Sequence, residues 1–261
     1  MKLYHAAVST CSQKVRLVLA EKGLEYESAL LDLQRGDQFD AAYLALNPNA
    51  VVPTLENRGR ALIESTLINE YLDDAYPEPA LKPLDAAERH RMRLWTRRID
   101  DALHPACGVV TYAIGVRPAL LKRPREEVAA LLAQIPDPQR RANRQAVIDE
   151  GVHAAVFAAA CGAHAALFDD VDGHLTRHAW LAGSDYSLAD AALTPYVVRV
   201  DHLGMGALLE QRPQLAAWYQ RVQQRASFDP AVSAWLAQPL IDGFRASGAA
   251  VAAELDELLR R

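Results

Sequence analysis

The sequence predicts an α/β domain followed by an all-helical domain, and three observations indicate this. Short apolar runs alternate with helical spacing over residues 1–78. A proline-rich stretch, 79–86, is typical of a linker. From residue 87 to residue 261 apolar side chains recur with the 3.6-residue period of helices. The first part is therefore expected to form a small mixed sheet with helices on both faces, and the second a helical bundle.

Four strands and three helices are expected in the first part. Residues 2–4 form a short apolar run, and residues 15–21 have helical spacing that ends at Gly23, because glycine accepts the left-handed conformation that follows a helix. The remaining elements are a strand over 26–31, a helix over 39–46, strands over 53–56 and 61–63, and a helix over 65–76. The predicted order is β-α-β-α-β-β-α.

The second part is expected to contain helices over residues 90–103, 142–168, 188–201 and 213–224. Proline lacks a backbone N–H, and glycine weakens a helix interior. We therefore expect helix breaks at Pro105, Pro118, residues 136–138 and Gly173.

The composition indicates a globular cytoplasmic protein. Hydrophobic residues make up 51% and charged residues 23%, which excludes disordered and collagen-like chains. A net charge of −5 gives no reason to expect a nucleic-acid partner. The three cysteines form no CxxC pair, which favours a reducing compartment over a disulfide scaffold. No apolar run approaches the ~20 residues of a membrane span, and no secretory signal is recognisable.

The segment from Ser9 to Leu17 lies between the first strand and the first helix. The first turn of a helix has unpaired N–H groups, which together with the helix dipole stabilise an anion. The hydroxyl of Ser9 can donate a hydrogen bond to an incoming thiolate. Simple capping of the helix by Ser9, Thr10 or Ser12 is an alternative explanation of the same pattern.

Two further segments suit binding of a peptide-like ligand. Pro53 stands where a strand begins, and a cis Val52–Pro53 bond would turn the Val52 backbone outward to pair with an extended ligand. Glu64 and Ser65 begin a helix, where Ser65 can bind a carboxylate and Glu64 an ammonium group. The pair suits an α-amino acid, although a capped helix start has the same pattern.

In this order, the three segments resemble the cytosolic glutathione transferase superfamily over nearly the whole chain. The resemblance implies a thioredoxin-like domain over 1–78 that binds glutathione as co-substrate, and a helical domain over 87–261 with the electrophile pocket. It implies that Ser9 activates the thiol, that Val52 and cis Pro53 bind the glutathione backbone, and that Glu64 and Ser65 bind its γ-glutamyl end. It also implies a homodimer without a metal. Residues 187–190 are similar to the capping box of the family, with a hydroxyl at the N-cap and a carboxylate three residues later.

Two branches of the superfamily match different motifs. Residues 9–16 resemble the zeta class, the maleylacetoacetate isomerases. Residues 47–53, 64–72 and 91–96, with the long segment 103–151, are more similar to bacterial glutathione-dependent β-etherases. In the etherase pattern Ser12 takes the serine position, and Gln38 matches a glutamine that reaches glutathione. Ala50 and Val51 replace a polar residue of many relatives, which implies modest affinity for glutathione.

We expect an enzyme, a glutathione S-transferase with a detoxification role, that activates the thiol for attack on a small hydrophobic electrophile such as a β-aryl ether. A thiol of pKa ≈ 8.5 is only ~3% thiolate at pH 7, and lowering its pKa by ~2 units requires about 2.7 kcal/mol. One serine donor and a helix N-terminus can supply this. Trp95 and Tyr112 are expected to line the electrophile pocket, from their helix positions. The alternatives are a zeta-class isomerase, a non-catalytic glutathione-binding protein, and Cys11 as the reactive group; the electrophile stays open.

Overall fold

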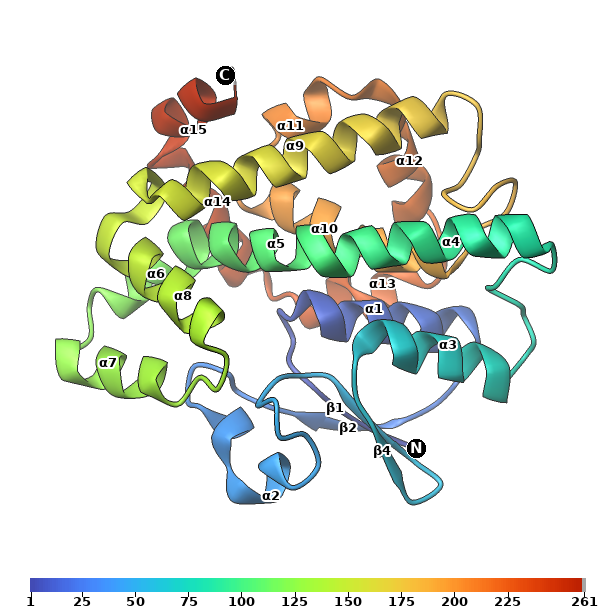
Figure 1. Cartoon of the computed structure of the whole chain (residues 1–261), viewed down its shortest axis with the longest axis horizontal. Helices are drawn as coiled ribbons and strands as arrows, with labels where there is room; N and C mark the ends of the chain where they lie inside the picture. Colours follow the sequence, from blue (N-terminus) through green and yellow to red (C-terminus); the bar gives the residue numbers. More distant parts are fainter. Residues whose placement is uncertain (260–261) are drawn as a thin grey trace. The chain divides into compact units, whose positions relative to one another are not determined.

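The computed structural model describes residues 1–259, and the chain divides into two compact units (Figure 1). Unit 1 comprises Met1–Thr96, Trp180–Pro195 and Arg221–Leu236, and unit 2 comprises Arg97–Ala179, Tyr196–Gln220 and the described residues from Ala237 onward. Each unit is therefore assembled from three separate stretches of chain. A division into two consecutive domains with a linker over 79–86 stays a prediction.

Unit 1 contains a four-stranded mixed sheet in the order β2-β1-β3-β4. The strands β1 (Lys2–His5) and β2 (Glu27–Leu30) are parallel, β3 (Thr54–Asn57) is antiparallel to β1, and β4 (Arg60–Leu62) is antiparallel to β3. Four strands in a mixed sheet were predicted, and the prediction is confirmed. Leu3 and Leu55, which pair across the centre of the sheet, are completely buried.

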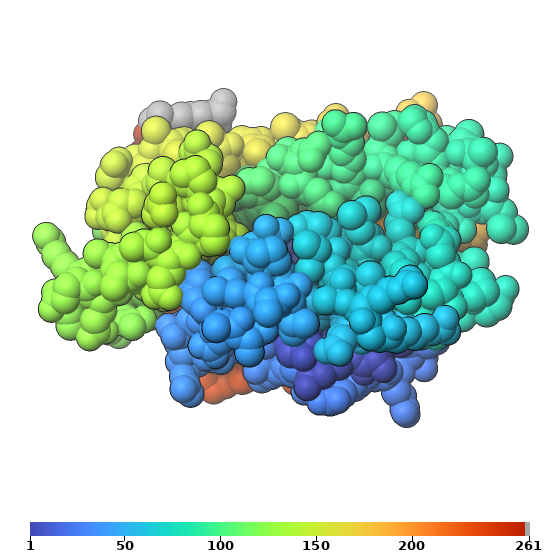
Figure 2. Space-filling view, turned by 60° about the horizontal axis from the view of Figure 1, so that its bottom comes forward, coloured from blue at the N-terminus to red at the C-terminus, as the bar shows by residue number. Residues whose placement is uncertain are grey.

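Helices cover both faces of this sheet. Figure 1 shows α1 (Thr10–Glu21) and α3 (Ser65–Ala75) side by side on one face, and α2 (Ala41–Leu44) on the other. The short η1 (Asp37–Phe39) precedes α2. Figure 2 looks onto the side of unit 1 where this segment (blue) lies at the surface. The predicted order β-α-β-α-β-β-α is confirmed.

Local sequence explains where α1 begins and ends. Ser9 is its N-cap, with an extended backbone and a side chain that accepts the N–H of Ser12. After the helix, Gly23 has φ +61°, its N–H donates to Ala20 O at 3.1 Å, and the N–H of Leu24 donates to Leu19 O at 2.9 Å. These two bonds form a Schellman motif, which requires a residue that tolerates positive φ.

Unit 1 also contains most of α4 (Ala86–Arg98), the start of α10 (Leu188–His202), α13 (Phe228–Ala231) and η5 (Ser233–Trp235). The capping box at the start of α10 is confirmed. The Asp190 carboxylate accepts the N–H of Ser187 at 3.0 Å and its hydroxyl at 2.9 Å, and the N–H of Ala189 donates to Ser187 Oγ at 3.3 Å.

Unit 2 is helical throughout its elements. In chain order these are η2 (Ile99–Leu103), α5 (His104–Val110), η3 (Thr111–Val116), α6 (Arg117–Leu120), α7 (Arg125–Ala133), α8 (Pro138–Glu150), η4 (Gly151–His153), α9 (Ala155–Leu175), the part of α10 from Tyr196 onward, α11 (Ala207–Glu210), most of α12 (Pro213–Gln223), α14 (Gln238–Ala249) and α15 (Ala252–Leu259). The helical prediction is confirmed, while several of the expected boundaries are wrong.

The chain stays helical from residue 86 to residue 120, so the breaks expected at Pro105 and Pro118 are wrong. Each proline lies in the first two residues of a helix, α5 or α6, directly after a π-helical segment. The wider π-helical turn before each proline accommodates the ring and the missing N–H, so the helix continues. The break at residues 136–138 is confirmed, since α7 ends before it and α8 begins at Pro138.

The expected helix over 142–168 is two helices, because Gly151 has φ +64° and ends α8. The axis bends by 85° between 138–153 and α9. Gly173 lies inside α9, so the break expected there is also wrong. A β-carbon at Gly173 would meet nothing within 4 Å, and an interior glycine costs only ~1 kcal/mol.

Among residues 1–259 no single helix is long and apolar enough to cross a membrane. The bent pair Pro138–His153 and Ala155–Leu175 meets the length and composition criteria when taken together, as buried helices of a core also can.

Candidate functional site

The topology of the sheet brings four loops of unit 1 to one edge. β1 and β2 are parallel, so the segments that follow them start at the same edge. β3 begins at this edge, because its first residue, Thr54, pairs with Tyr4 near the end of β1. β4 ends at the same edge, because its last residue, Leu62, pairs with Leu55 near the start of β3. The four loops carry the predicted residues Ser9, Gln38, Val52, Pro53, Glu64 and Ser65. The three segments expected to bind one tripeptide therefore share one edge of the sheet.

Ser9 and Ser12 have opposite environments. Ser9 is partly exposed, and its Oγ accepts the Ser12 N–H at 3.2 Å, which leaves its own proton free of any acceptor among residues 1–259. Ser12 is completely buried, and its Oγ accepts the N–H of Ala6 at 3.3 Å. Cys11 is partly exposed. Of the two serines, Ser9 has the accessible hydroxyl at the N-terminus of α1.

The Val52–Pro53 bond is cis, as the resemblance implied. Two side chains orient the preceding carbonyl: Tyr43 donates its hydroxyl to Val51 O at 2.6 Å, and Asn47 Nδ2 donates to the same oxygen at 2.9 Å. Val52 itself packs against Ala6 and Tyr43 in a small apolar cluster. The backbone before β3 is thus supported from both the β1 and the α2 side of unit 1.

The two loops that flank β3 and β4 contain residues with positive φ. Ala50 has φ 50° and Glu64 has φ 67°, a conformation that costs free energy for residues other than glycine and occurs often at functional sites. Glu64 is exposed, and Ser65 is 6% exposed where α3 begins. The Lys14 amine donates to Thr66 Oγ1 at 2.7 Å, which brings a cation to the first turn of α3. This arrangement favours an anion there.

Gln38 is 7% exposed, and its Oε1 is buried without a hydrogen-bond partner among the residues described. A buried carbonyl oxygen without a donor costs free energy, and a ligand that donated a hydrogen bond to it would remove this cost. The side chain is consistent with the predicted contact to glutathione.

A buried cluster beside the Ser9 loop was missed by the sequence analysis. Arg16 is 1% exposed and donates to the carbonyls of Ala6 at 3.2 Å, Ala7 at 3.0 Å and Ala231 at 2.8 Å, and to His5 Nδ1 at 3.0 Å. Burial, with the charge of Arg16, lowers the pKa of His5 to about 4, so His5 is neutral. The Trp235 ring lies 5.0 Å from the Arg16 guanidinium. In the sequence, the signal for this cluster was Arg16 itself, a second cation two positions after Lys14 in a predicted helix.

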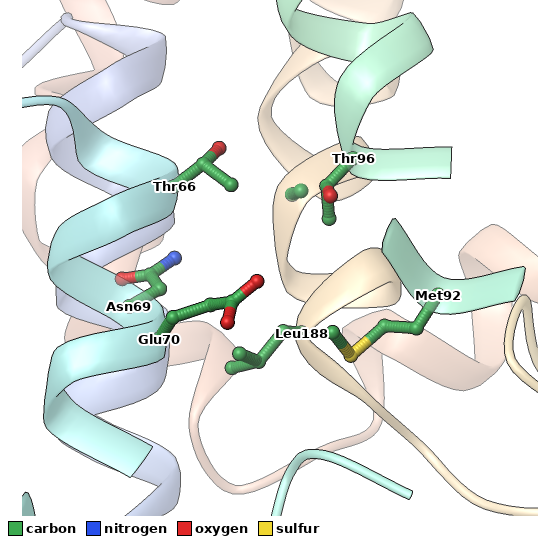
Figure 3. A pocket seen from close by; sticks show the side chains of 7 residues that line it. Thr66, Asn69, Glu70, Met92, Thr96 and Leu188 are labelled. Atoms are coloured by element: carbon green, nitrogen blue, oxygen red, sulfur yellow. The ribbon is translucent and has the colours of Figure 1, made fainter. Parts of the chain in front are cut away.

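The two residues expected in the electrophile pocket belong to different units. Trp95 is 8% exposed in unit 1, and Tyr112 is partly exposed in unit 2. A shallow hollow of unit 1, between α3, α4 and α10, is lined by Thr66, Asn69, Glu70, Met92, Thr96, Leu188 and Ala192 (Figure 3). Trp95 does not line it, and the role of both aromatic residues stays a prediction.

Within residues 1–259 no group of three or more His, Cys, Asp or Glu side chains is arranged to bind a metal ion.

Models of two protein families match the chain. The glutathione S-transferase N-terminal domain matches residues 3–80, and the glutathione S-transferase C-terminal domain matches residues 141–226. The chain is 30% identical to the tetrachloro-p-hydroquinone reductive dehalogenase of Sphingobium chlorophenolicum, over 88% of this chain and 95% of that protein.

The crystal structure of the β-etherase LigF from Sphingobium sp. strain SYK-6 is similar in fold. Its TM-score is 0.78 at 25% identity, over 88% of this chain and 98% of that chain. The maleylacetoacetate isomerase of Pseudomonas aeruginosa is 44% identical over 108 residues, which are 40% of this chain and 51% of that protein. The dehalogenase and the β-etherase match over most of the chain, and the maleylacetoacetate isomerase over a shorter part. The structure of a zeta-class maleylpyruvate isomerase is also similar over 91% of this chain and 98% of that chain, with a TM-score of 0.66 at 26% identity.

Proposed function

Because this chain belongs to the glutathione S-transferase family, we propose that Ser9 activates the thiol of glutathione for attack on a small hydrophobic electrophile. The observation that carries the proposal is the environment of Ser9. Its hydroxyl is partly exposed at the N-cap of α1, and its proton has no acceptor among residues 1–259. It can therefore donate to a thiolate, while the helix N-terminus stabilises the same charge.

The remaining residues of the shared edge bind glutathione in this proposal. The backbone of Val52, next to Pro53, pairs with the cysteinyl part as an added strand would. Ser65 and the first turn of α3 bind the γ-glutamyl carboxylate, and the exposed Glu64 binds its ammonium group. Gln38 donates or accepts a hydrogen bond through its buried amide. Ser12 supports the loop through the Ala6 N–H and does not touch the thiol.

The electrophile is a substituted aromatic compound or an aryl ether in this proposal, on the strength of the dehalogenase and β-etherase similarity. The thiolate sulfur forms a bond to carbon, the bond from that carbon to chlorine or oxygen breaks, and the leaving group departs with the electron pair. Trp95 and Tyr112 contact the electrophile. The isomerase similarity over 108 residues supports a second candidate, a zeta-class isomerase that adds and removes glutathione across a double bond.

We further propose a cytoplasmic homodimer with a detoxification role. Leu67 on α3 is 63% exposed and Leu94 on α4 is 49% exposed, both within unit 1. A second copy that covered these two leucines would remove apolar area from water. A sedimentation experiment that found only a monomer of 28.7 kDa at all concentrations would contradict the dimer.

Substitution Ser9→Ala tests the proposed role of Ser9. Loss of one hydrogen bond to a charged sulfur should raise the pKa of bound glutathione by about 1–2 units. We expect kcat/KM at pH 6.5 to fall by about tenfold to a hundredfold, with less loss at pH 9, where the thiol ionises unaided. The thiolate absorbance of the glutathione complex, titrated with pH, measures the pKa directly.

Ser12→Ala and Cys11→Ala are the matched controls, three and two residues from Ser9. Ser12→Ala should lower the free energy of unfolding by about 1–3 kcal/mol, because the buried Ala6 N–H loses its acceptor. Neither control should move the thiol pKa. A thiol pKa that is unchanged in Ser9→Ala but raised in Ser12→Ala would transfer the role to Ser12.

A further inference from the structure

Two arginines of α8, Arg140 and Arg144, interact electrostatically with Tyr112, and all three residues belong to unit 2. The Arg144 guanidinium is 4.1 Å from the centroid of the Tyr112 ring, which η3 provides. Arg140 precedes Arg144 by four residues, so both side chains leave the same face of α8. Burial lowers the pKa of Arg144, the Tyr112 hydroxyl opposes this shift, and the charge of Arg140 adds to it. The two cations are therefore close enough to repel each other.

These groups have few polar partners. Among residues 1–259 neither the Arg144 guanidinium nor the Tyr112 hydroxyl makes a hydrogen bond or an ion pair, and Arg140 Nε is buried without a hydrogen-bond partner. Asp137 attracts the charge of Arg140, but this carboxylate accepts the backbone N–H of Arg140 at 2.5 Å as the N-cap of α8.

Other arginines of this protein show what a satisfied guanidinium looks like. Arg225 makes two bonds to the Glu21 carboxylate, at 2.6 and 2.7 Å. Arg117 donates to Ile148 O at 2.8 Å and to Asp149 O at 3.3 Å. Removing a charge from water without such partners costs free energy, and the cost rises when a like charge is adjacent. Arg140 and Arg144, which are both partly exposed, thus carry neighbouring charges without a carboxylate bound to either guanidinium, and Arg140 Nε is buried without a partner among the residues described.

We propose that Arg140 and Arg144, with Tyr112, bind a carboxylate of the electrophile. A carboxylate presents two oxygens to a guanidinium fork, and one such group offsets the repulsion between the two arginines. The inference rests on the proposed function in one respect, that Tyr112 contacts the electrophile. It narrows the substrate class to hydrophobic electrophiles that carry an anionic carboxylate.

A pair of electrophiles that differ in one carboxylate tests the proposal. They are 2-chloro-1,3-dinitrobenzene and 4-chloro-3,5-dinitrobenzoate, in which both nitro groups lie next to the chlorine-bearing carbon. In both, the thiolate sulfur bonds to the ring carbon that bears chlorine, chloride leaves with the bonding electron pair, and the thiol proton passes to solvent. For Arg144→Met we expect kcat/KM for the benzoate to fall by about tenfold or more, with little change for the neutral compound. Arg140→Met should have the same selective effect.

The matched control is Arg125→Met, which removes one positive charge from an exposed side chain of unit 2. Arg125→Met should leave the ratio of kcat/KM for the benzoate to kcat/KM for the neutral compound unchanged. A fall of this ratio in Arg144→Met or Arg140→Met is then not an effect of net charge. If Arg144→Met does not fold, Arg144→Lys takes its place, because lysine retains a charge and cannot make two parallel bonds. The proposal is overturned if the ratio of kcat/KM for the benzoate to kcat/KM for the neutral compound is the same in the wild type and in the arginine variants.

A binding experiment separates this proposal from the proposed function. Calorimetric titration with 3,5-dinitrobenzoate and with 1,3-dinitrobenzene needs no turnover. If the wild type converts neither electrophile, the transferase proposal fails, while selective weakening of benzoate binding in Arg144→Met still supports the anion site. Equal affinity of the wild type and Arg144→Met for the benzoate overturns the site even if both electrophiles are conjugated.

Discussion

His164 shows how burial alone decides the charge of a side chain in this protein. It is completely buried in α9, its Nδ1 donates to Ala160 O at 2.8 Å, and its Nε2 has no hydrogen-bond partner among the residues described. Burial lowers the pKa of His164 to about 4. A protonated ring would leave a charge without an acceptor next to the edge-on ring of Phe168.

This depressed pKa predicts acid sensitivity. The unfolded chain binds a proton near pH 6.5, whereas the native His164 binds one only near pH 4, so the unfolded state carries more protons between these values. The free energy of unfolding should therefore fall as pH falls through this window, by on the order of 3 kcal/mol for this one group. His5, whose pKa is also lowered to about 4, acts in the same direction.

Urea unfolding of His164→Leu at several pH values between 7 and 4 measures the effect. The variant should lose less stability than the wild type across the window, whatever its stability at pH 7. The exposed His153, replaced in the same way, controls for removal of a histidine. Identical pH slopes in the wild type and His164→Leu would contradict the assignment.

Residue patterns predicted which segments form the candidate site, but not which side chain faces solvent. The positions of Ser9, Pro53 and Ser65 at element boundaries were predictable, because serine and proline have strong preferences there. The burial of Ser12 was not, since it depends on the Ala6 N–H, which only the bend between β1 and α1 brings within 3.3 Å. The same holds for Arg16, whose acceptor Ala231 is 215 residues away in the chain.

At the scale of elements, α14 shows how closely two helices can approach. A β-carbon at Gly248 would lie 2.0 Å from Leu203 O and 2.8 Å from Leu203 C, both backbone atoms at the end of α10. Gly204, with φ +72°, lies at the same contact. All three residues belong to unit 2, so the contact is internal to that unit.

Gly248→Ala should therefore displace α14, because a backbone carbonyl cannot move aside as a flexible side chain can. We expect the free energy of unfolding to fall by about 3 kcal/mol or more. Gly243→Ala, five residues earlier in the same helix, is the matched control, since nothing lies within 4 Å of its β-carbon. It should stabilise the protein by roughly 0.5–1 kcal/mol. Similar midpoints of chemical unfolding for the two variants would contradict the close approach.

The elements of the first 80 residues were predicted more accurately than those that follow. Strands and helices alternate there, and Gly23 ends α1 through a motif that glycine favours. In unit 2 all described secondary-structure elements are helical, so the hydrophobic period does not change where one helix ends and the next begins. The bend at Gly151 lies inside a continuous helical pattern, and Pro105 interrupts nothing because a π-helical segment precedes it.

At the scale of the whole molecule, unit 1 is completed by chain from the second half of the sequence. Arg16 donates to Ala231 O, and its guanidinium lies over the ring of Trp235. At the other end of α1, Glu21 accepts two bonds from Arg225 and the hydroxyl of Ser227. The residues that support the Ser9 loop are therefore contributed by both ends of the sequence.

A fragment that ends at residue 80 should not fold cooperatively. It retains the whole sheet, yet it leaves the buried guanidinium of Arg16 without its acceptor at Ala231 and the carboxylate of Glu21 without Arg225. Near-ultraviolet circular dichroism and urea unfolding of the fragment measure this, with the full chain as reference. A sharp sigmoidal transition in the fragment would contradict the expectation.

The contact between Arg16 and Ala231 has a consequence for how such enzymes diversify. A recombination event near residue 80 would combine residues 1–80 of one parent with residue 231 of another. The buried guanidinium of Arg16 would then lie against a carbonyl whose position differs from that of Ala231 O in its own parent. Exchange of the glutathione-binding half between relatives should succeed mainly when the stretch 221–236 is inherited with it. A library of chimaeras should therefore be built with two crossovers, so that residues 1–80 and residues 221–236 come from the same parent. We expect most chimaeras that fold to have this combination.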